Sequence, residues 1–145
     1  MRTHPFLRAY MAGITVPTLV LLLIMSADAI HRSYFAASTI WVLDIEVTRL
    51  ERALIFPMAF VPNLWGLWNG LYVAVHRHQP AWPLGLHGAL LVLFLVPAGV
   101  ALLGALGVVN ISLVTVLPVI PFVMALYYLV WKFVVGFLNR EVGIG

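Results

Sequence analysis

The sequence predicts an all-α integral membrane protein in which one membrane domain, residues 1–145, crosses the bilayer four times. Hydrophobic residues make up 63% of the chain and charged residues only 9%, whereas soluble domains carry roughly 25% charged residues. The segment from His78 to Trp131 contains no Lys, Arg, Asp or Glu and is long enough to cross a bilayer twice. Four apolar runs each reach the length of about 20 residues that a spanning helix needs.

The composition and the absence of known motifs exclude several classes of function. The chain has no Cys, so disulfides, thiolate metal sites and cysteine catalysis are excluded. Its net charge of +3 is small, and its basic residues are not grouped with aromatic ones, so we expect no nucleic-acid partner. Nucleophile elbows, His-Glu-x-x-His, phosphate loops and Rossmann glycine patterns are missing. We therefore assign no catalytic residue, no metal ligand and no cofactor.

The first span is predicted over residues 9–30. Arg2 and Arg8 precede its apolar run, and Ala27-Asp28-Ala29 follows, which is also the pattern of a cleavable signal peptide. We expect an uncleaved helix, because the run from Ala9 is long enough to span the membrane.

Residues 31–52 form a predicted outer loop. Thr48 and Glu51 make a capping-box pattern, so the second helix should begin outside the hydrocarbon. Apolar residues at helical spacing between residues 40 and 54 predict that the segment between spans one and two contains an amphipathic helix lying at the outer membrane interface. Residues 44–48 also alternate as a strand would.

This loop and its edges hold seven of the thirteen charged residues (eight Lys or Arg and five Asp or Glu). The candidate outer polar cluster consists of Asp28, His31, Arg32, Asp44, Glu46, Arg49, Glu51 and Arg52. It can be interpreted as a cation site, an anionic head-group site or an acid–base pair. Its spacing matches no ligand motif, so a solvated loop with paired charges is the simpler interpretation, with Asp28 and Arg32 pairing at i, i+4.

The second span, residues 53–75, has two distinct faces. Small residues at helical spacing define a packing face, made of Ala59, Asn63, Gly66, Gly70 and Ala74. Gly66 and Gly70 form a GxxxG motif, and Asn63 can hydrogen-bond across the contact. We expect this face to meet span three, span four or another subunit. The opposite face carries Trp65, Trp68 and Tyr72, which either pack in the core or line an apolar ligand pocket.

Spans three and four are predicted over residues 82–106 and 111–137. Every span contains proline, and Pro118-Val-Ile-Pro121 is the strongest candidate for a helix break. His76 and His78 end span two, and His87 begins span three. Paired histidines can ligate haem. These histidines are expected at the membrane interface and not inside the bundle, so a polar cluster at the interface is the simpler interpretation. We expect the side chain of His87 to extend toward the surface.

Basic residues predict the orientation. Arg2, Arg8, Arg77, Lys132 and Arg140 share one side and outnumber Arg32, Arg49 and Arg52 on the other, so both termini should be cytoplasmic in a bacterial-type plasma (inner) membrane. We expect membrane lipids and a homo-oligomer or a larger membrane complex as partners. The leading function is an oligomeric or accessory subunit without catalysis. The alternatives are a small transporter or channel for an apolar or weakly polar solute, and an enzyme acting on lipid head groups at the outer surface.

Overall fold

The structure is a computed structural model. It describes residues 4–34, 41–42, 45–46, 50–76, 81–105, 107 and 112–144, with side chains described in 4–30, 60–76, 81–105, 107 and 112–144. Three long helices come first: α1 (Pro5–Tyr34), α2 (Leu50–His76) and α3 (Leu84–Ala105). The last helical run is divided into α4 (Leu113–Val116), the 3₁₀ turn η1 (Leu117–Val119), α5 (Ile120–Val130), the π turn η2 (Trp131–Val135) and α6 (Gly136–Glu141).

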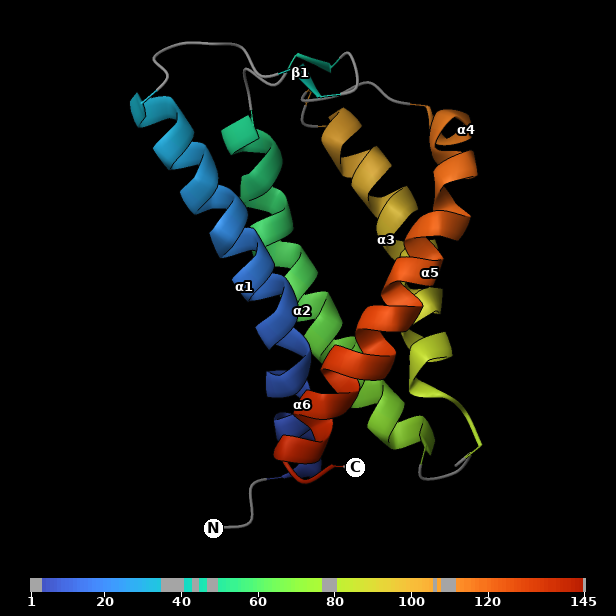
Figure 1. The fold of residues 1–145 in the computed structure, drawn as a ribbon. Helices are drawn as coiled ribbons and strands as arrows, with labels where there is room; N and C mark the ends of the chain where they lie inside the picture. The colour runs from blue at the N-terminus through green and yellow to red at the C-terminus, as the bar shows by residue number, and fades with distance from the viewer. Residues whose placement is uncertain are drawn as a thin grey trace.

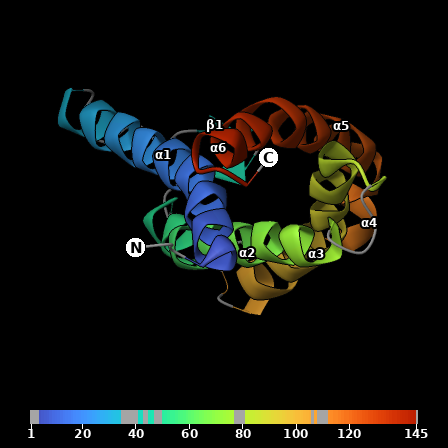
Figure 2. The same ribbon diagram turned by 90° about the horizontal axis from the view of Figure 1, so that it is seen from below.

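The helices form two pairs, α1 with α2 and α3 with α5. The pairs converge at the end that holds both termini and separate toward the end that holds α4 (Figure 1). Viewed from the side of the termini, the helices follow an incomplete ring in which α6 lies beside α1 (Figure 2). The convergent end is therefore where side chains from the beginning, middle and end of the chain meet.

Three helical segments of the described chain are long and apolar enough to cross a membrane: Pro5–Ile30, Leu84–Ala105 and Leu113–Glu141. This agrees with the predicted helical fold with membrane-spanning helices. Helix α2 runs from Leu50 to His76, where the second span was predicted, and its role as a fourth span stays a prediction.

The prediction of an amphipathic helix upstream of α2 is wrong for the residues of this segment that the structure describes. Trp41–Val42 (β1) and Ile45–Glu46 (β2) pair as antiparallel strands, with Trp41 opposite Glu46 and Val42 opposite Ile45. Alternation and β-branched residues favour strand here over a helical spacing that rests on a few apolar residues. Thr48, the predicted cap of α2, lies outside the described residues.

The break predicted at Pro118 and Pro121 is present. The 3₁₀ turn Leu117–Val119 separates α4 from α5, and a proline occupies the first turn of both η1 and α5. Proline is tolerated there because the first amides of a helix have no intrahelical acceptor. Pro17 and Pro97, in contrast, lie inside the continuous helices α1 and α3.

The C-terminal helix ends in a Schellman motif. Gly143 has a φ of 71°. The amide of Ile144 donates to the carbonyl of Asn139 at 2.8 Å, and the amide of Gly143 donates to the carbonyl of Arg140 at 2.9 Å. This pattern satisfies helix-end carbonyls and favours glycine at the left-handed position.

Arg8 of α1 binds this same helix end. Its Nη1 donates to the carbonyl of Val142 at 2.8 Å and to that of Gly143 at 3.4 Å. A cation is stabilised at the C-terminal end of a helix by the dipole of the helix. The first and last helices of the chain are thus joined at the convergent end.

Candidate functional site

Polar and aromatic side chains from α2, α3 and the last helical run meet where the two helix pairs converge. We call this group the interior cluster; it consists of Trp65, Trp68, Asn69, Tyr72, His87, Tyr127, Trp131 and Asn139. Several of these side chains are almost completely buried. Buried polar atoms usually bond inside the protein, but Nε1 of Trp65 and Nε1 of Trp131 have no hydrogen-bond partner among the described residues.

Two asparagines form a reciprocal amide pair at the base of the cluster. Asn69 is 0% exposed and Asn139 is 4% exposed. The Nδ2 of Asn69 donates to Oδ1 of Asn139 at 2.7 Å, and the Nδ2 of Asn139 donates back at 3.1 Å. Asn69 Nδ2 also donates to the carbonyl of Ala9 at 2.8 Å. This pair therefore holds α1, α2 and α6 together, as interhelical amides do in membrane proteins.

His87 and Trp68 bind each other between α3 and α2. Nε2 of His87 lies 2.9 Å from the Trp68 carbonyl, and Nε1 of Trp68 donates to the His87 carbonyl at 2.8 Å. A carbonyl only accepts, so Nε2 of His87 carries a proton in this arrangement. The two rings stack with centroids 4.9 Å apart, and His87 is only 5% exposed. The expectation that His87 extends to the surface is wrong, because partners inside the protein satisfy it.

Trp131 occupies the centre of the cluster. It is completely buried, and its ring covers Gly88 so closely that a Cβ there would overlap the indole. The ring of Trp65 lies 5.4 Å from that of Trp131 and 5.1 Å from that of Tyr127. Gly88 thus allows a large ring to pass between α3 and the last helical run.

His76 and His87 both pack on the ring of Tyr72, with centroid distances of 5.1 and 5.3 Å. His78 lies outside the described residues. Across the part of the chain that the structure describes, no three His, Asp or Glu side chains are grouped as a metal site would require.

The predicted packing face of α2 meets α1. A Cβ on Gly66 would lie 2.6 Å from Cγ2 of Ile14, and one on Gly70 would overlap the ring of Phe6. The hydroxyl of Tyr10 donates to Oδ1 of Asn63 across the same contact.

We expected this face to meet span three, span four or another subunit. It meets span one instead, so that expectation is wrong. The physical reason is Gly13 of α1: a Cβ there would lie 2.6 Å from the carbonyl oxygen of Trp65 and 2.8 Å from Cα of Gly66. Small residues let two helix backbones approach closely, and here glycines lie on both sides of the contact. Ala74, the last residue of the predicted face, is exposed.

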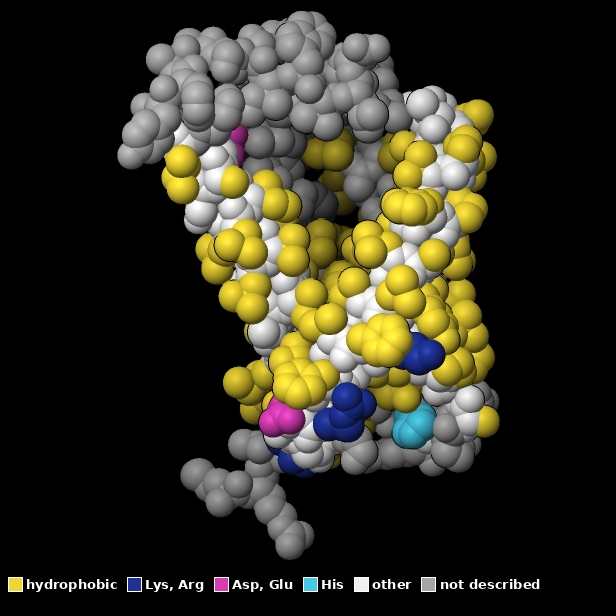
Figure 3. Space-filling view, in the orientation of Figure 1, with side chains coloured by type: hydrophobic (Ala, Val, Ile, Leu, Met, Phe, Trp, Pro, Cys, Tyr) yellow, Lys and Arg dark blue, Asp and Glu magenta, His cyan; other side chains and the backbone are white. Residues whose placement is uncertain are grey.

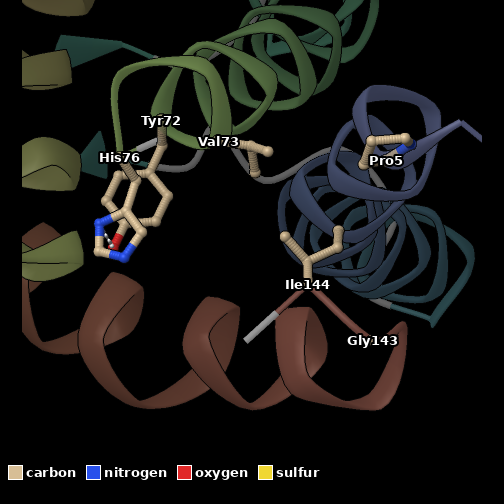
Figure 4. Close-up of a pocket in the computed structure, with 6 residues that line it drawn as sticks. All are labelled: Pro5, Tyr72, Val73, His76, Gly143 and Ile144. Atoms are coloured by element: carbon tan, nitrogen blue, oxygen red, sulfur yellow. Dashed lines mark hydrogen bonds between the residues drawn. The ribbon is translucent and has the colours of Figure 1, made fainter. Parts of the chain in front are cut away.

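The predicted ligand face of α2 points into the interior cluster. Trp65 and Trp68 pack against rings of the last helical run and of α3. Tyr72 also lines a pocket of about 210 Å³ at the convergent end, whose lining residues are Pro5, Tyr72, Val73, His76, Gly143 and Ile144. Figure 4 shows Tyr72 and His76 side by side on α2, facing the pocket from one wall. Their Oη and Nδ1 atoms are 3.3 Å apart.

Most of the outer polar cluster lies outside the side chains that the structure describes. Asp28 is half-buried, and α1 is helical through Tyr34. The i, i+4 spacing of Asp28 and Arg32 therefore falls on one continuous helix, as the predicted pair requires. The cluster as a site stays a prediction.

Sequence reasoning missed Asn69, Asn139 and the role of Arg8. The available signal was an amide inside an apolar run, because such residues in membrane helices usually bond to another helix. Their 70-residue separation leaves no local pattern that would pair them.

No protein-family model, curated protein or solved structure matches this chain.

We expect His87→Phe to lower the thermal unfolding midpoint in detergent, while His76→Phe changes it little. Phenylalanine keeps a ring against Trp68 but removes the hydrogen bond to the Trp68 carbonyl, which is worth about 1 kcal/mol. His76, whose ring is only partly buried, is the matched control. Equal midpoints for the two variants would contradict a structural role for the His87 bond.

Proposed function

We propose that this chain is a small polytopic membrane protein that spans the bilayer four times and acts as an oligomeric or accessory subunit, without catalysis of its own. The use of its polar groups supports this. Inside the protein Asn69 pairs with Asn139 and His87 with Trp68, and at the exposed side of the α1–α2 contact Tyr10 pairs with Asn63. Each pair joins two helices, so these polar groups serve the helix scaffold, and the apolar outer surface remains available for contacts with other chains.

The observation that carries the proposal is the outer half of α1. After Leu21, no residue of α1 through Ile30 is buried, and Leu23 is 70% exposed. In Figure 1 this half lies away from α3 and α5, where the helix pairs separate. It also presents the small residues Ser26 and Ala27 to its surroundings, and small residues let a neighbouring helix approach closely. We assign the outer half of α1, residues 19–30, as the assembly face.

The positions of the termini support four spans. The start of α1 and the end of α6 lie at the same end of the bundle (Figure 1), where Pro5 and Ile144 line one pocket, and this requires an even number of crossings if all long helices cross. Three candidate spans are found by length and apolarity, and the proposal takes α2 as the fourth. The basic residues Arg8, Lys132 and Arg140 lie toward this end, so the positive-inside rule favours a cytoplasmic side there and a plasma (inner) membrane location.

The test is the protein mass of the particle extracted from native membranes, measured by light scattering. We expect at least twice the 16.1 kDa of one chain, and a monomeric particle would contradict the proposal. Because the chain has no Cys, single cysteines can locate the contact. Leu23→Cys should form a disulfide-linked dimer, or a link to a partner that carries a thiol. Phe122→Cys, on α5 and 74% exposed, is the control and should not; equal crosslinking would move the contact away from α1.

A small transporter is the second candidate, and the pocket at the convergent end favours it. Tyr72, Val73 and His76 form one wall, and Ile144 lies across from them. This combination of apolar walls with a few polar atoms is typical of sites for small, weakly polar molecules. A monomeric particle in the mass measurement would favour this candidate over the first.

A further inference from the structure

In the last helical run a basic residue, Lys132, directly follows a long apolar stretch. No Lys, Arg, Asp or Glu precedes Lys132 between Leu113 and Trp131. Lys132 is exposed, and its ammonium lies 5.7 Å from the ring centre of Tyr128 and 5.3 Å from that of Phe133. Within the described part of the chain, no carboxylate forms an ion pair with it. Lys residues near the ends of membrane helices extend to the interface, where they meet lipid head groups.

The depth of Lys132 matches the level of lipid phosphates. Lys132 follows Leu113 by nineteen residues, which at about 1.5 Å per residue corresponds to about 28 Å of helix. The hydrocarbon layer is about 30 Å thick. If α4 begins near one boundary of this layer, Lys132 lies at the other. Arg140 is eight residues farther along, about 12 Å beyond this boundary.

The aromatic partners of Lys132 are held by the fold. Tyr128 packs over Gly85 of α3, where a Cβ would lie 2.8 Å from Cε2 of the ring. Its ring is therefore fixed between two helices, and the Lys132 side chain rests on it. In Figure 3 the basic side chains of this face gather over the lower part of the last helical run, with hydrophobic side chains above them.

An apolar stripe leads from this position toward the membrane centre. Phe122, Leu126, Leu129 and Phe133 are spaced by four, three and four, and each is at least 50% exposed. Residues at this spacing share one face of a helix. The stripe thus offers a continuous apolar surface, on the scale of an acyl chain, that ends beside the Lys132 ammonium.

We propose that this face binds an anionic phospholipid, with its phosphate on Lys132 and one acyl chain along the stripe from Phe133 to Phe122. Charge complementarity selects this occupant: the site has one cation that no carboxylate among the described residues pairs with, aromatic rings at its sides and an apolar extension. The inference rests on the membrane placement in the proposed function, because only there does Lys132 meet phosphates. It does not depend on the oligomeric state.

The test is lipid retention by the purified full-length protein, measured by native mass spectrometry. Protein equilibrated with equal amounts of phosphatidylglycerol and phosphatidylcholine of the same acyl composition should retain the anionic lipid about fivefold more, as expected for one basic residue near phosphates. Lys132→Gln should bring this ratio close to one, and Lys132→Arg should restore it. Because Lys132 is exposed, the variants should elute as the wild type does in size exclusion.

Matched variants separate local binding from general attraction. Arg140→Gln removes the same charge beyond the phosphate level and should leave most of the preference. Leu126→Ser interrupts the stripe and should lower retention of both lipids without changing their ratio. The head group without acyl chains, glycerophosphoglycerol in large excess, should not displace the bound lipid.

Three results would overturn the proposal: an unchanged ratio in Lys132→Gln, an equal loss in Arg140→Gln, or displacement by the free head group. The first would leave Lys132 available for a carboxylate of a neighbouring protein, and the last would indicate a site for a bare anion. A monomeric particle in the mass measurement, in contrast, would contradict the proposed assembly and leave the lipid ratio unaffected.

Discussion

Gly13→Ala is expected to lower the free energy of unfolding by about 1–3 kcal/mol, the usual effect of overpacking a close contact. Gly13→Leu should prevent the folded protein from accumulating. A Cβ at Gly13 would lie 2.6 Å from the Trp65 carbonyl oxygen and 2.8 Å from Cα of Gly66. Both neighbours are backbone atoms, so no side-chain rotation can relieve the clash. Helices α1 and α2 must move apart, which would also pull Asn69 away from the carbonyl of Ala9.

The matched control is Gly99 of α3, where an added Cβ meets no atom within 4 Å. Gly99→Ala should leave stability unchanged or raise it by up to about 1 kcal/mol, since alanine is the better helix former. The measurement is reversible unfolding in mixed micelles, followed by circular dichroism. If Gly13→Ala and Gly99→Ala had the same stability, the close contact of α1 with α2 would be refuted.

Asn69→Leu is expected to destabilise the protein by about 2 kcal/mol. The change leaves the buried amide of Asn139 without its partner, and an unsatisfied buried polar group costs about 1–3 kcal/mol. Asn139→Leu should have a similar effect for the same reason. Asn63→Leu is the control on the same helix, because Asn63 is exposed and its loss should cost less than about 1 kcal/mol.

The double variant, Asn69→Leu with Asn139→Leu, separates pairing from other effects. Once one amide is gone, removing the other abolishes an unpaired group, so the double variant should be no less stable than either single variant. This corresponds to a coupling energy of about 2 kcal/mol in a double-mutant cycle. Strictly additive losses would show that the two amides act independently and would contradict the reciprocal pair.

The sequence predicted the helices well because they follow from local composition. The long apolar runs, the break at Pro118 and Pro121, and the small-residue face around Gly66 all depend on neighbouring residues along the chain. Which helix would meet that face was not predictable in the same way. Periodicity shows which residues share a face but contains no information about the opposite helix, and Gly13 alone is a weak signal.

The interior cluster was largely beyond prediction for a related reason. His87 was expected near the surface because it lies near a helix end, yet neighbouring helices extend past it and Trp68 satisfies its imidazole. The strand pair at Trp41–Val42 and Ile45–Glu46 shows another limit. When a short segment has both a helical and an alternating pattern, its secondary structure depends on which backbone partner is nearby. The spacing of residues in the sequence does not identify that partner.

The contact between Arg8 and the carbonyl of Val142 joins residues 134 positions apart, and this separation has a consequence for biogenesis. Membrane chains are made from the N-terminus onward, and early segments fold first. Helices α1 and α2 can pair as soon as both are inserted, because the contact of Gly13 with Gly66 involves no later helix. Arg8 and Asn69 must wait until the last helix has been synthesised. During that interval the partly buried guanidinium of Arg8 and the Oδ1 atom of Asn69 lack their final partners, so the nascent α1–α2 hairpin is the stage at which quality control can distinguish an unfinished chain from a finished one.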